Sequence, residues 1–260
     1  MPLADRFDGL LVDLDGVVWI GRDPVPGSPE ALRALLDAGK RLVFVTNNPG
    51  KPPATYAKRL LELGVHVAPE QIVTAGMVVA RLAAEAAGDD GGAFVIGAPA
   101  LKEMVAASGP RLLDHEGARE ANVVVVSGHR GFDYREMLAA KQALDRGAAL
   151  LATSRDPTMP FPGGEVPGTG AVLAAVETAS GRRATIAGKP EHHLFEMAIE
   201  VAGGGRLAMV GDRVASDIAG GRNAGLETIL VLSGTTSREQ AGVAEPGPDH
   251  LLEDLSGLLA

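Results

Sequence analysis

Cysteine is absent from all 260 residues of the chain. This absence excludes disulfide bonds, zinc–thiolate sites and catalysis by a thiol nucleophile. Aromatic residues are also rare, at 3% of the chain, whereas hydrophobic residues make up 46%. The core of such a protein is therefore built mainly from aliphatic side chains.

Positive charge is scarce as well. The chain has 24 Lys and Arg residues against 33 Asp and Glu residues, which gives a formal net charge of -9. A negative field of this size repels a polyanion, so binding to nucleic acid is disfavoured. A small anionic substrate remains compatible with the sequence, because local groups or a bound metal ion can outweigh the field of the whole molecule.

The beginning of the chain has no long hydrophobic run. The first residues, MPLADRFDG, carry charges, and the apolar run that follows is too short and too acidic for a signal peptide or a membrane span. We therefore expect a cytoplasmic protein without a membrane partner.

Short aliphatic runs alternate with amphipathic segments along the whole chain. LLVDLD and RLVFVT are typical of buried strands, and residues 29–38 and 54–63 have the periodicity of helices. Ser28 before Pro29 predicts a helix start at which the hydroxyl caps free N–H groups. The alternation predicts an α/β fold around a parallel sheet. Later strands are expected at AFVIG, NVVVVSG, AALLAT, LAMVGD and TILVL.

The stretch DPTMPFPGGEVPGTG, at 156–170, is rich in proline and glycine. Its composition predicts a long loop without regular structure of its own. Loops of this kind usually bind a ligand or gate a site, so we expect this one to be functional.

Polar residues follow several of the apolar runs, and parallel α/β sheets bind ligands at the carboxyl ends of their strands. Each of these residues also suits an ordinary turn, helix start or solvated loop, so no single one identifies a site. Their occurrence at four strand ends is better explained by one shared site. The residues are Asp13 and Asp15 after LLV, Thr46 and Asn47 after RLVFV, Lys189 after RATIAG, and Asp212 and Asp217 after LAMVG.

Four crowded aspartates would repel one another and raise one another's pKa values unless a cation were bound. Magnesium suits such a site, because it takes a few carboxylates, keeps several waters and leaves room for a substrate phosphate. The Lys189 ammonium and the Thr46 hydroxyl then offer charge and hydrogen bonds to phosphate oxygens. The set predicts a phosphoryl-transfer site that uses Mg²⁺.

The ordered combination of DLDGV, a threonine ending the second strand, a lysine before proline, and GDRVASD resembles the four motifs of the haloacid dehalogenase (HAD) superfamily. TNN, PGTGA and GKP further resemble its subfamily IIA, of p-nitrophenyl phosphatase and phosphoglycolate phosphatase type. The resemblance implies a Rossmann-like core of parallel strands formed by residues 1–75 and 185–260. It also implies a large α/β cap domain of the C2 type, inserted at residues 76–184.

A reaction is implied by the same resemblance. Asp13 would attack phosphorus and form an aspartyl-phosphate, while Asp15 would protonate the leaving alcohol and then take a proton from the hydrolytic water. Thr46 and the backbone of Asn47 would hold the transferring phosphate, and Lys189 would offset its charge. The implied enzyme is a magnesium-dependent phosphatase of small phosphate monoesters.

For the metal, the family's ligands correspond to the Asp13 carboxylate, the backbone carbonyl of Asp15 and the Asp212 carboxylate. Asp217 would be a supporting carboxylate. Close relatives often have a further aspartate where this chain has Ala215. Because Asp212 and Asp217 are retained, metal binding is expected to survive, with an altered affinity.

Substrate choice is expected to reside in two loops of the cap, at 127–134 and 153–160. Their polar side chains could recognise hydroxyls or a second anionic group, although the arginines suit solvated loops equally well. Relatives commonly have Thr-Asn-Pro-Asp where this chain has TSRDP, which weakens an assignment of the substrate by analogy. The candidates are His129, Arg130, Arg155 and Asp156.

Trp19 follows shortly after the DGV segment. We expect its side chain to pack in a short flap beside the site, with stacking on the substrate as a secondary alternative.

Two other functions remain open. A phosphotransferase would use the same aspartyl-phosphate with a sugar hydroxyl in place of water. A catalytically silent binding module would have lost at least one of Asp13, Asp15, Lys189 and Asp212, yet all four are present. The expected partner is a small phosphate ester, and the resemblance is compatible with a homodimer.

Overall fold

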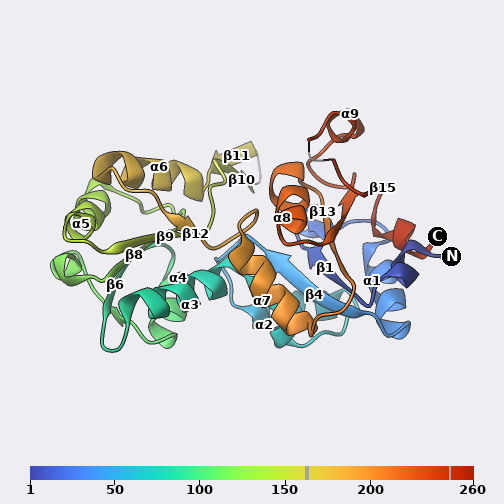
Figure 1. Cartoon of the computed structure of the whole chain (residues 1–260), viewed down its shortest axis with the longest axis horizontal. Coiled ribbons are helices and arrows are strands. Elements are labelled where there is room, and N and C mark those ends of the chain that lie inside the picture. The colour runs from blue at the N-terminus through green and yellow to red at the C-terminus, as the bar shows by residue number, and fades with distance from the viewer. Residues whose placement is uncertain (162–163, 246) are drawn as a thin grey trace. The chain divides into compact units, whose positions relative to one another are not determined.

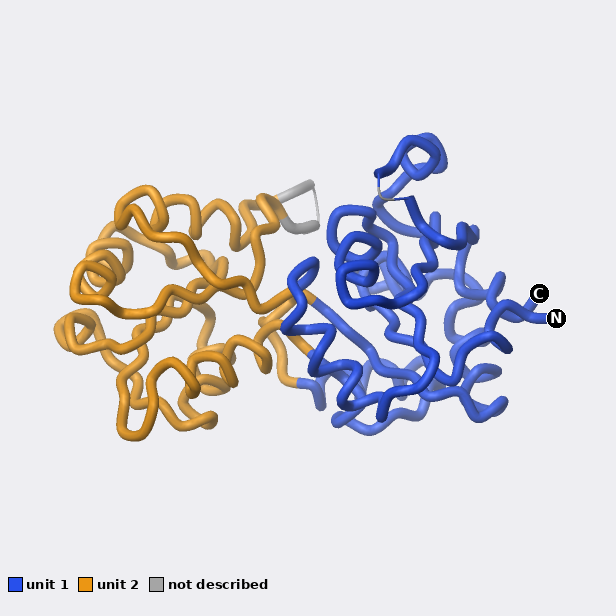
Figure 2. Tube along the Cα trace, viewed as in Figure 1, with its two compact units in different colours: residues 1–46, 53–73, 189–260 blue, residues 47–52, 74–188 orange. Residues whose placement is uncertain are grey.

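The computed structural model of the chain describes residues 1–161, 164–245 and 247–260. Two compact units make up the structure (Figure 2). Unit 1 comprises residues 1–46, 53–73 and 189–260, and unit 2 comprises residues 47–52 and 74–188.

A six-stranded sheet in the order β15-β14-β13-β1-β4-β5 is the basis of unit 1 (Figure 1). β1 pairs in parallel with both β13 and β4, so the strand order reverses between β1 and β13. Open parallel sheets bind ligands at the carboxyl ends of the strands beside such a reversal. The strands are β1 Gly9–Asp13, β4 Arg41–Thr46, β5 Ile72–Thr74, β13 Leu207–Gly211, β14 Glu227–Val231 and β15 His250–Leu252.

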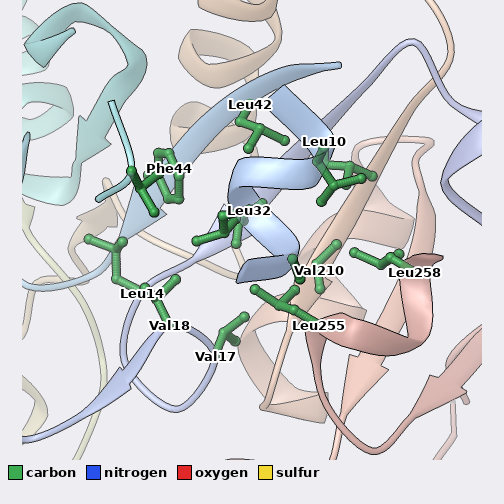
Figure 3. Packing of buried hydrophobic residues seen from close by; sticks show 14 of the residues in the cluster. Leu10, Leu14, Val17, Val18, Leu32, Leu42, Phe44, Val210, Leu255 and Leu258 are labelled. Carbon is green, nitrogen blue, oxygen red and sulfur yellow. The ribbon is translucent and has the colours of Figure 1, made fainter. Parts of the chain in front are cut away.

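Helices pack on both faces of this sheet, which is why every residue of β1 is buried. On one face Leu32 of α1 packs with Leu42 and Phe44 of β4 in an aliphatic core (Figure 3). On the other face α7 contacts β1 and β4. The helices are α1 Ser28–Asp37, α2 Pro53–Glu62, α7 His192–Ala202, α8 Ala219–Asn223 and α9 Arg238–Gly242, with short 3-10 helices at Leu3–Arg6, Pro69–Gln71 and Leu255–Leu259.

The start of α1 differs from the prediction. The helix begins at Ser28, one residue early, and its N-cap is Gly27, whose φ of 79° lies in the left-handed region. The Ser28 hydroxyl donates to the backbone carbonyl of Val17 at 2.8 Å. Within the described part of the chain, no side-chain hydrogen bond caps the start of this helix. The predicted capping role is therefore wrong, because a buried carbonyl in the preceding segment uses the hydroxyl.

A second parallel sheet, in the order β12-β9-β8-β6-β7, is the basis of unit 2. Aliphatic residues of β8 pack with α5 and α6 in a core of its own. The strands are β6 Gly92–Ile96, β7 Arg111–Leu112, β8 Val123–Val126, β9 Ala149–Ala152 and β12 Thr185–Ile186. The helices are α3 Ala75–Ala87, α4 Pro99–Ala107, α5 Tyr134–Asp145, α6 Thr169–Ser180 and the 3-10 helix Ala118–Glu120. Two helix-flanked parallel sheets confirm the predicted α/β fold class.

The stretch at 156–170 is not a loop without regular structure. β10 Thr158–Phe161 and β11 Gly164–Pro167 pair as an antiparallel hairpin within it, and the predicted loop at 162–163 lies outside the described residues. The prediction was wrong because richness in proline and glycine does not prevent pairing in a two-stranded ribbon, where each strand has an edge on which the missing N–H is not needed.

Candidate active site

Unit 1 brings Asp13, Thr46 and Asp212 to one edge of its sheet. Asp13 ends β1, Thr46 ends β4, and Asp212 follows the last residue of β13. Because these strands are adjacent and parallel, their carboxyl ends meet beside the reversal in strand order. All three side chains are buried, with exposed fractions of 7% for Asp13, 2% for Thr46 and 1% for Asp212.

Lys189 lies between two of the predicted aspartates. Its Nζ is 2.7 Å from Asp13 Oδ1 and 2.6 Å from Asp217 Oδ1. The three side chains are at most 9% exposed, so water screens these ion pairs weakly. The ammonium therefore holds the Asp13 carboxylate in one orientation.

The electrostatic balance of the site is negative. Burial raises the pKa of Asp13 well above its ordinary value; Lys189 acts against the rise, and the Asp217 and Asp212 carboxylates add to it. Burial and the Asp217 carboxylate likewise raise the pKa of Asp212. Burial disfavours the charged Lys189, but the carboxylates of Asp13 and Asp217 outweigh it and raise its pKa, which keeps the ammonium protonated. Two of the three carboxylates, those of Asp13 and Asp217, thus share the Lys189 ammonium.

A divalent cation fits this donor set. One carboxylate oxygen from each of Asp13, Asp212 and Asp217 can be chosen so that the three atoms lie within 4.8 Å of one another. Asp212 Oδ2 accepts the backbone N–H of Thr235 at 2.6 Å. Asp212 Oδ1 is buried and has no hydrogen-bond partner among the residues that the structure describes. An ion with two positive charges would supply that partner and, with Lys189, neutralise the three carboxylates.

Local backbone structure places two of these carboxylates. Asp217 lies in a π-helix, Val214–Ile218, and its Oδ2 accepts the N–H of Arg213 at 3.0 Å. Gly16 has a φ of 89°, and a Cβ there would lie 2.4 Å from Asp212 Oδ2. Only glycine therefore fits beside that carboxylate. The π-helix has no signal in the sequence, whereas the need for glycine was contained in the DLDGV motif.

Asp15 has a different environment from the other aspartates, because it is exposed. Its Oδ1 accepts the indole N–H of Trp19 at 3.0 Å. Trp19 begins a two-stranded hairpin, β2 Trp19–Ile20 and β3 Asp23–Pro24, and its side chain is 1% exposed. The prediction that Trp19 packs in a short flap is confirmed, but the hydrogen bond to Asp15 was not anticipated.

The remaining predicted residues belong to unit 2. Asn47 Nδ2 donates to Asp156 Oδ2 at 3.2 Å, so these two candidates contact each other. His129 Nε2 lies 2.7 Å from Glu136 Oε2, and Arg130 is exposed. Their parts in substrate recognition stay predictions.

Arg155 has a carboxylate partner inside unit 2 that the sequence analysis did not identify. Its Nη1 and Nη2 donate to Glu177 Oε2 and Oε1 at 3.0 and 2.8 Å. Glu177 also accepts from Arg183 and from the backbone N–H of Ala184. These contacts lower the pKa of Glu177 to about 2, with the hydrogen bond from Arg155 as the main cause.

Glu177→Gln should destabilise the protein by about 1 kcal/mol at pH 7, because the glutamine keeps the shape but loses the charge; both arginines are partly solvated, which limits the effect. A carboxyl whose folded pKa is depressed stabilises the fold above its ordinary pKa of 4.5, and that contribution is lost as the pH falls toward 2. The difference between wild type and variant in urea unfolding should therefore shrink from pH 5 to pH 3. A difference that does not change with pH would contradict the assignment.

Among the residues that the structure describes, no helix is both long enough and apolar enough to cross a membrane.

The family of the chain follows from comparison with known proteins. Residues 10–111 match the haloacid dehalogenase-like hydrolase family, and residues 186–258 match a second, HAD-hydrolase-like family. The chain belongs to the HAD-like hydrolases.

Individual relatives agree with this assignment. Chronophin of Bos taurus is 36% identical over 277 residues, which cover 99% of this chain and 94% of chronophin. Human glycerol-3-phosphate phosphatase is 38% identical over 90% of this chain and 81% of its own length. A crystal structure of glycerol phosphate phosphatase from Mycobacterium tuberculosis, in complex with magnesium, superposes with a TM-score of 0.92 at 34% identity, covering 100% of this chain and 78% of that one. The predicted family and phosphatase class are confirmed.

Proposed function

We propose that the chain is a magnesium-dependent phosphatase that hydrolyses small phosphate monoesters through an aspartyl-phosphate on Asp13. The observation that carries this proposal is the buried group of Asp13, Lys189, Asp217 and Asp212 at the carboxyl edge of the parallel sheet. Without a bound cation these carboxylates would repel a negatively charged phosphoryl group. With a cation bound, the same residues stabilise it, as phosphoryl transfer requires.

In the first step a carboxylate oxygen of Asp13 attacks phosphorus. The bond from phosphorus to the ester oxygen breaks, and Asp15 gives its proton to the leaving alcohol. In the second step Asp15 takes a proton from a water that attacks the same phosphorus, which releases phosphate and restores the Asp13 carboxylate. Lys189, 2.7 Å from Asp13 Oδ1, orients the nucleophile and offsets charge on the phosphoryl oxygens.

The Asp13 carboxylate, the backbone carbonyl of Asp15 and the Asp212 carboxylate would hold Mg²⁺. The ion supplies positive charge next to the transferring phosphoryl group and compensates the crowded carboxylates. The orphaned Asp212 Oδ1 supports this assignment. Asp217 acts through Lys189, with which it is paired at 2.6 Å, and so supports the site without binding the substrate.

Phosphate oxygens are bound by the Thr46 hydroxyl and the backbone N–H of Asn47, together with Lys189. The backbone role of Asn47 is supported by its side chain, which is engaged with Asp156. Thr46 is the last residue of unit 1 before the segment 47–52 of unit 2, and Lys189 is the first residue of unit 1 after the segment 74–188.

Unit 2 is proposed as the cap that selects the substrate. Most of unit 2, residues 74–188, lies between two of the three segments of unit 1, which is typical of such caps. The extent proposed for the cap stays at residues 76–184. One human relative is named glycerol-3-phosphate phosphatase, so phosphate esters of small polyols are the first substrates to test. A location in the cytoplasm and a homodimer remain predictions.

Phosphate release decides the proposal. We expect the protein to release phosphate from at least one member of a panel containing glycerol 3-phosphate, phosphoglycolate, sugar phosphates, pyridoxal phosphate, nucleoside monophosphates and p-nitrophenyl phosphate. Chelation of Mg²⁺ should lower the rate at least about 100-fold, since the carboxylates then repel the substrate.

Two outcomes would count against a phosphatase. Transfer of phosphoryl to an added sugar, without matching phosphate release, would assign a phosphotransferase. Failure to consume any ester in folded protein with Mg²⁺ would leave a binding module.

A further inference from the structure

The exposed side chain of Asp15 has to be held in place, because proton transfer to a leaving group requires a fixed position. In the structure the Asp15 Oδ1 accepts a hydrogen bond from Trp19 Nε1 at 3.0 Å. An indole N–H is a donor only, so Trp19 takes no part in the proton transfer itself. Its hydrogen bond uses Oδ1, and the proton transfer assigned to Asp15 needs only the other oxygen.

The indole is itself held firmly. Tyr56 stacks with the ring at a centroid distance of 6.5 Å and an interplanar angle of 5°. The guanidinium carbon of Arg59 lies 3.9 Å from the ring centroid, and the Arg59 Nη2 donates to the backbone carbonyl of Gly21 at 2.7 Å. Both side chains come from α2, so one helix fixes the position of the ring.

Backbone contacts tie the same segment together. The N–H of Gly16 donates to the carbonyl of Trp19 at 2.7 Å, and the N–H of Trp19 donates to the carbonyl of Leu14 at 3.2 Å. The Ser28 hydroxyl binds the carbonyl of Val17 in between. The turn that bears Asp15 is thereby closed onto Trp19.

We infer that Trp19 is a positioning residue: its indole N–H, fixed by Arg59 and Tyr56, holds the Asp15 carboxyl in line with the leaving oxygen of the substrate. This inference rests on the proposed function. It predicts that the indole N–H matters most for esters whose alcohol must be protonated as it leaves. An alkyl phosphate is such an ester, whereas p-nitrophenolate leaves without much help from an acid.

The chain has a single tryptophan, so an analogue incorporated in place of tryptophan changes this site alone. β-(3-Benzothienyl)alanine keeps the shape of the ring and has sulfur in place of the N–H. The matched control is 5-fluorotryptophan, which keeps the N–H. Thermal unfolding of each protein establishes that the analogue is accommodated.

The readout is kcat/KM for the best alkyl ester of the panel and for p-nitrophenyl phosphate. In the benzothienyl protein kcat/KM should fall about tenfold for the alkyl ester, because one hydrogen bond to a carboxylate is removed. For p-nitrophenyl phosphate kcat/KM should fall less than about threefold. The fluorotryptophan protein should retain the wild-type ratio of the two values. Arg59→Met, which removes the cation over the ring, should shift the ratio in the same direction.

Equal losses on both esters, or no loss, would overturn the inference, because a merely structural role for Trp19 affects both substrates alike. A wild-type protein that hydrolyses neither ester would instead overturn the proposed function, and the inference with it. A second readout needs no activity. The single indole N–H resonance in a ¹H–¹⁵N spectrum should move upfield in Asp15→Ala, which removes the acceptor, and an unchanged resonance would contradict the hydrogen bond.

Discussion

Asp13→Asn should abolish phosphate release, with a loss of at least about 10³-fold in kcat. The amide has no charged oxygen to attack phosphorus and cannot form the acyl phosphate. The substitution is nearly isosteric, and Lys189 keeps its contact with Asp217, so the fold should survive. The rate is measured with the best ester at saturating Mg²⁺.

The control for this variant is Asp37→Asn. Asp37 is an exposed aspartate at the end of α1 in the same unit, and its substitution removes the same charge without touching the site. It should leave the rate within about twofold of wild type. If Asp13→Asn retains a substantial rate while the protein is folded, Asp13 is not the nucleophile.

Lys189→Met should have the second large effect, on stability as well as activity. Removal of the ammonium leaves the Asp13 and Asp217 carboxylates buried without a counter-charge, which costs about 3–5 kcal/mol. Phosphate release should fall below detection, because the nucleophile is no longer oriented. Urea unfolding and the phosphatase assay measure the two effects.

The loss of stability in Lys189→Met should depend on pH in one direction. A buried carboxyl whose folded pKa is raised above its ordinary value of 3.8 destabilises the fold at higher pH, and the cost disappears as the carboxyl is protonated. The destabilisation by Lys189→Met should therefore be larger at pH 7 than at pH 5.

A double variant separates charge from catalysis. Lys189→Met combined with Asp217→Asn should recover part of the lost stability, since one of the two buried charges is gone, but should not recover activity. Lys189→Met with wild-type stability at pH 7 would contradict the buried ion pairs as the structural basis of the site.

The core of the site could be predicted because it depends on topology. In a parallel sheet the strand ends share an edge, so Asp13, Thr46 and Asp212 could be placed together from their positions after apolar runs. The charge argument for a cation depends only on their number and closeness. Lys189 is 176 residues from Asp13 in the sequence, and its place after a strand and before a proline indicates that it belongs to the same site.

Pairings between side chains in unit 2 could not be predicted in this way. Arg155 and Glu177 are 22 residues apart, and nothing in the sequence distinguishes this buried glutamate from glutamates that lie on exposed helix faces. Asn47 and Asp156 are 109 residues apart in the sequence and are brought together within unit 2. Both contacts depend on tertiary packing, whereas the hydrophobic periodicity of a sequence predicts only its helices and strands.

The sequence also could not decide which of several possible partners a side chain contacts. The Ser28 hydroxyl could cap its own helix or reach another carbonyl, and the structure has it on Val17. Trp19 could pack, stack on substrate or donate a hydrogen bond, and it both packs and donates to Asp15. Sequence patterns give the kind of contact that a residue can make, while the partner depends on the fold.

Trapping of the covalent intermediate shows directly whether Asp13 is the nucleophile. The protein is mixed with its best ester and Mg²⁺, quenched in acid within one turnover, reduced with borohydride and analysed by peptide mass spectrometry. We expect conversion of an aspartyl-phosphate to homoserine at Asp13 alone, with Asp15, Asp212 and Asp217 unchanged. Modification at another residue, or turnover with none at Asp13, would contradict this expectation.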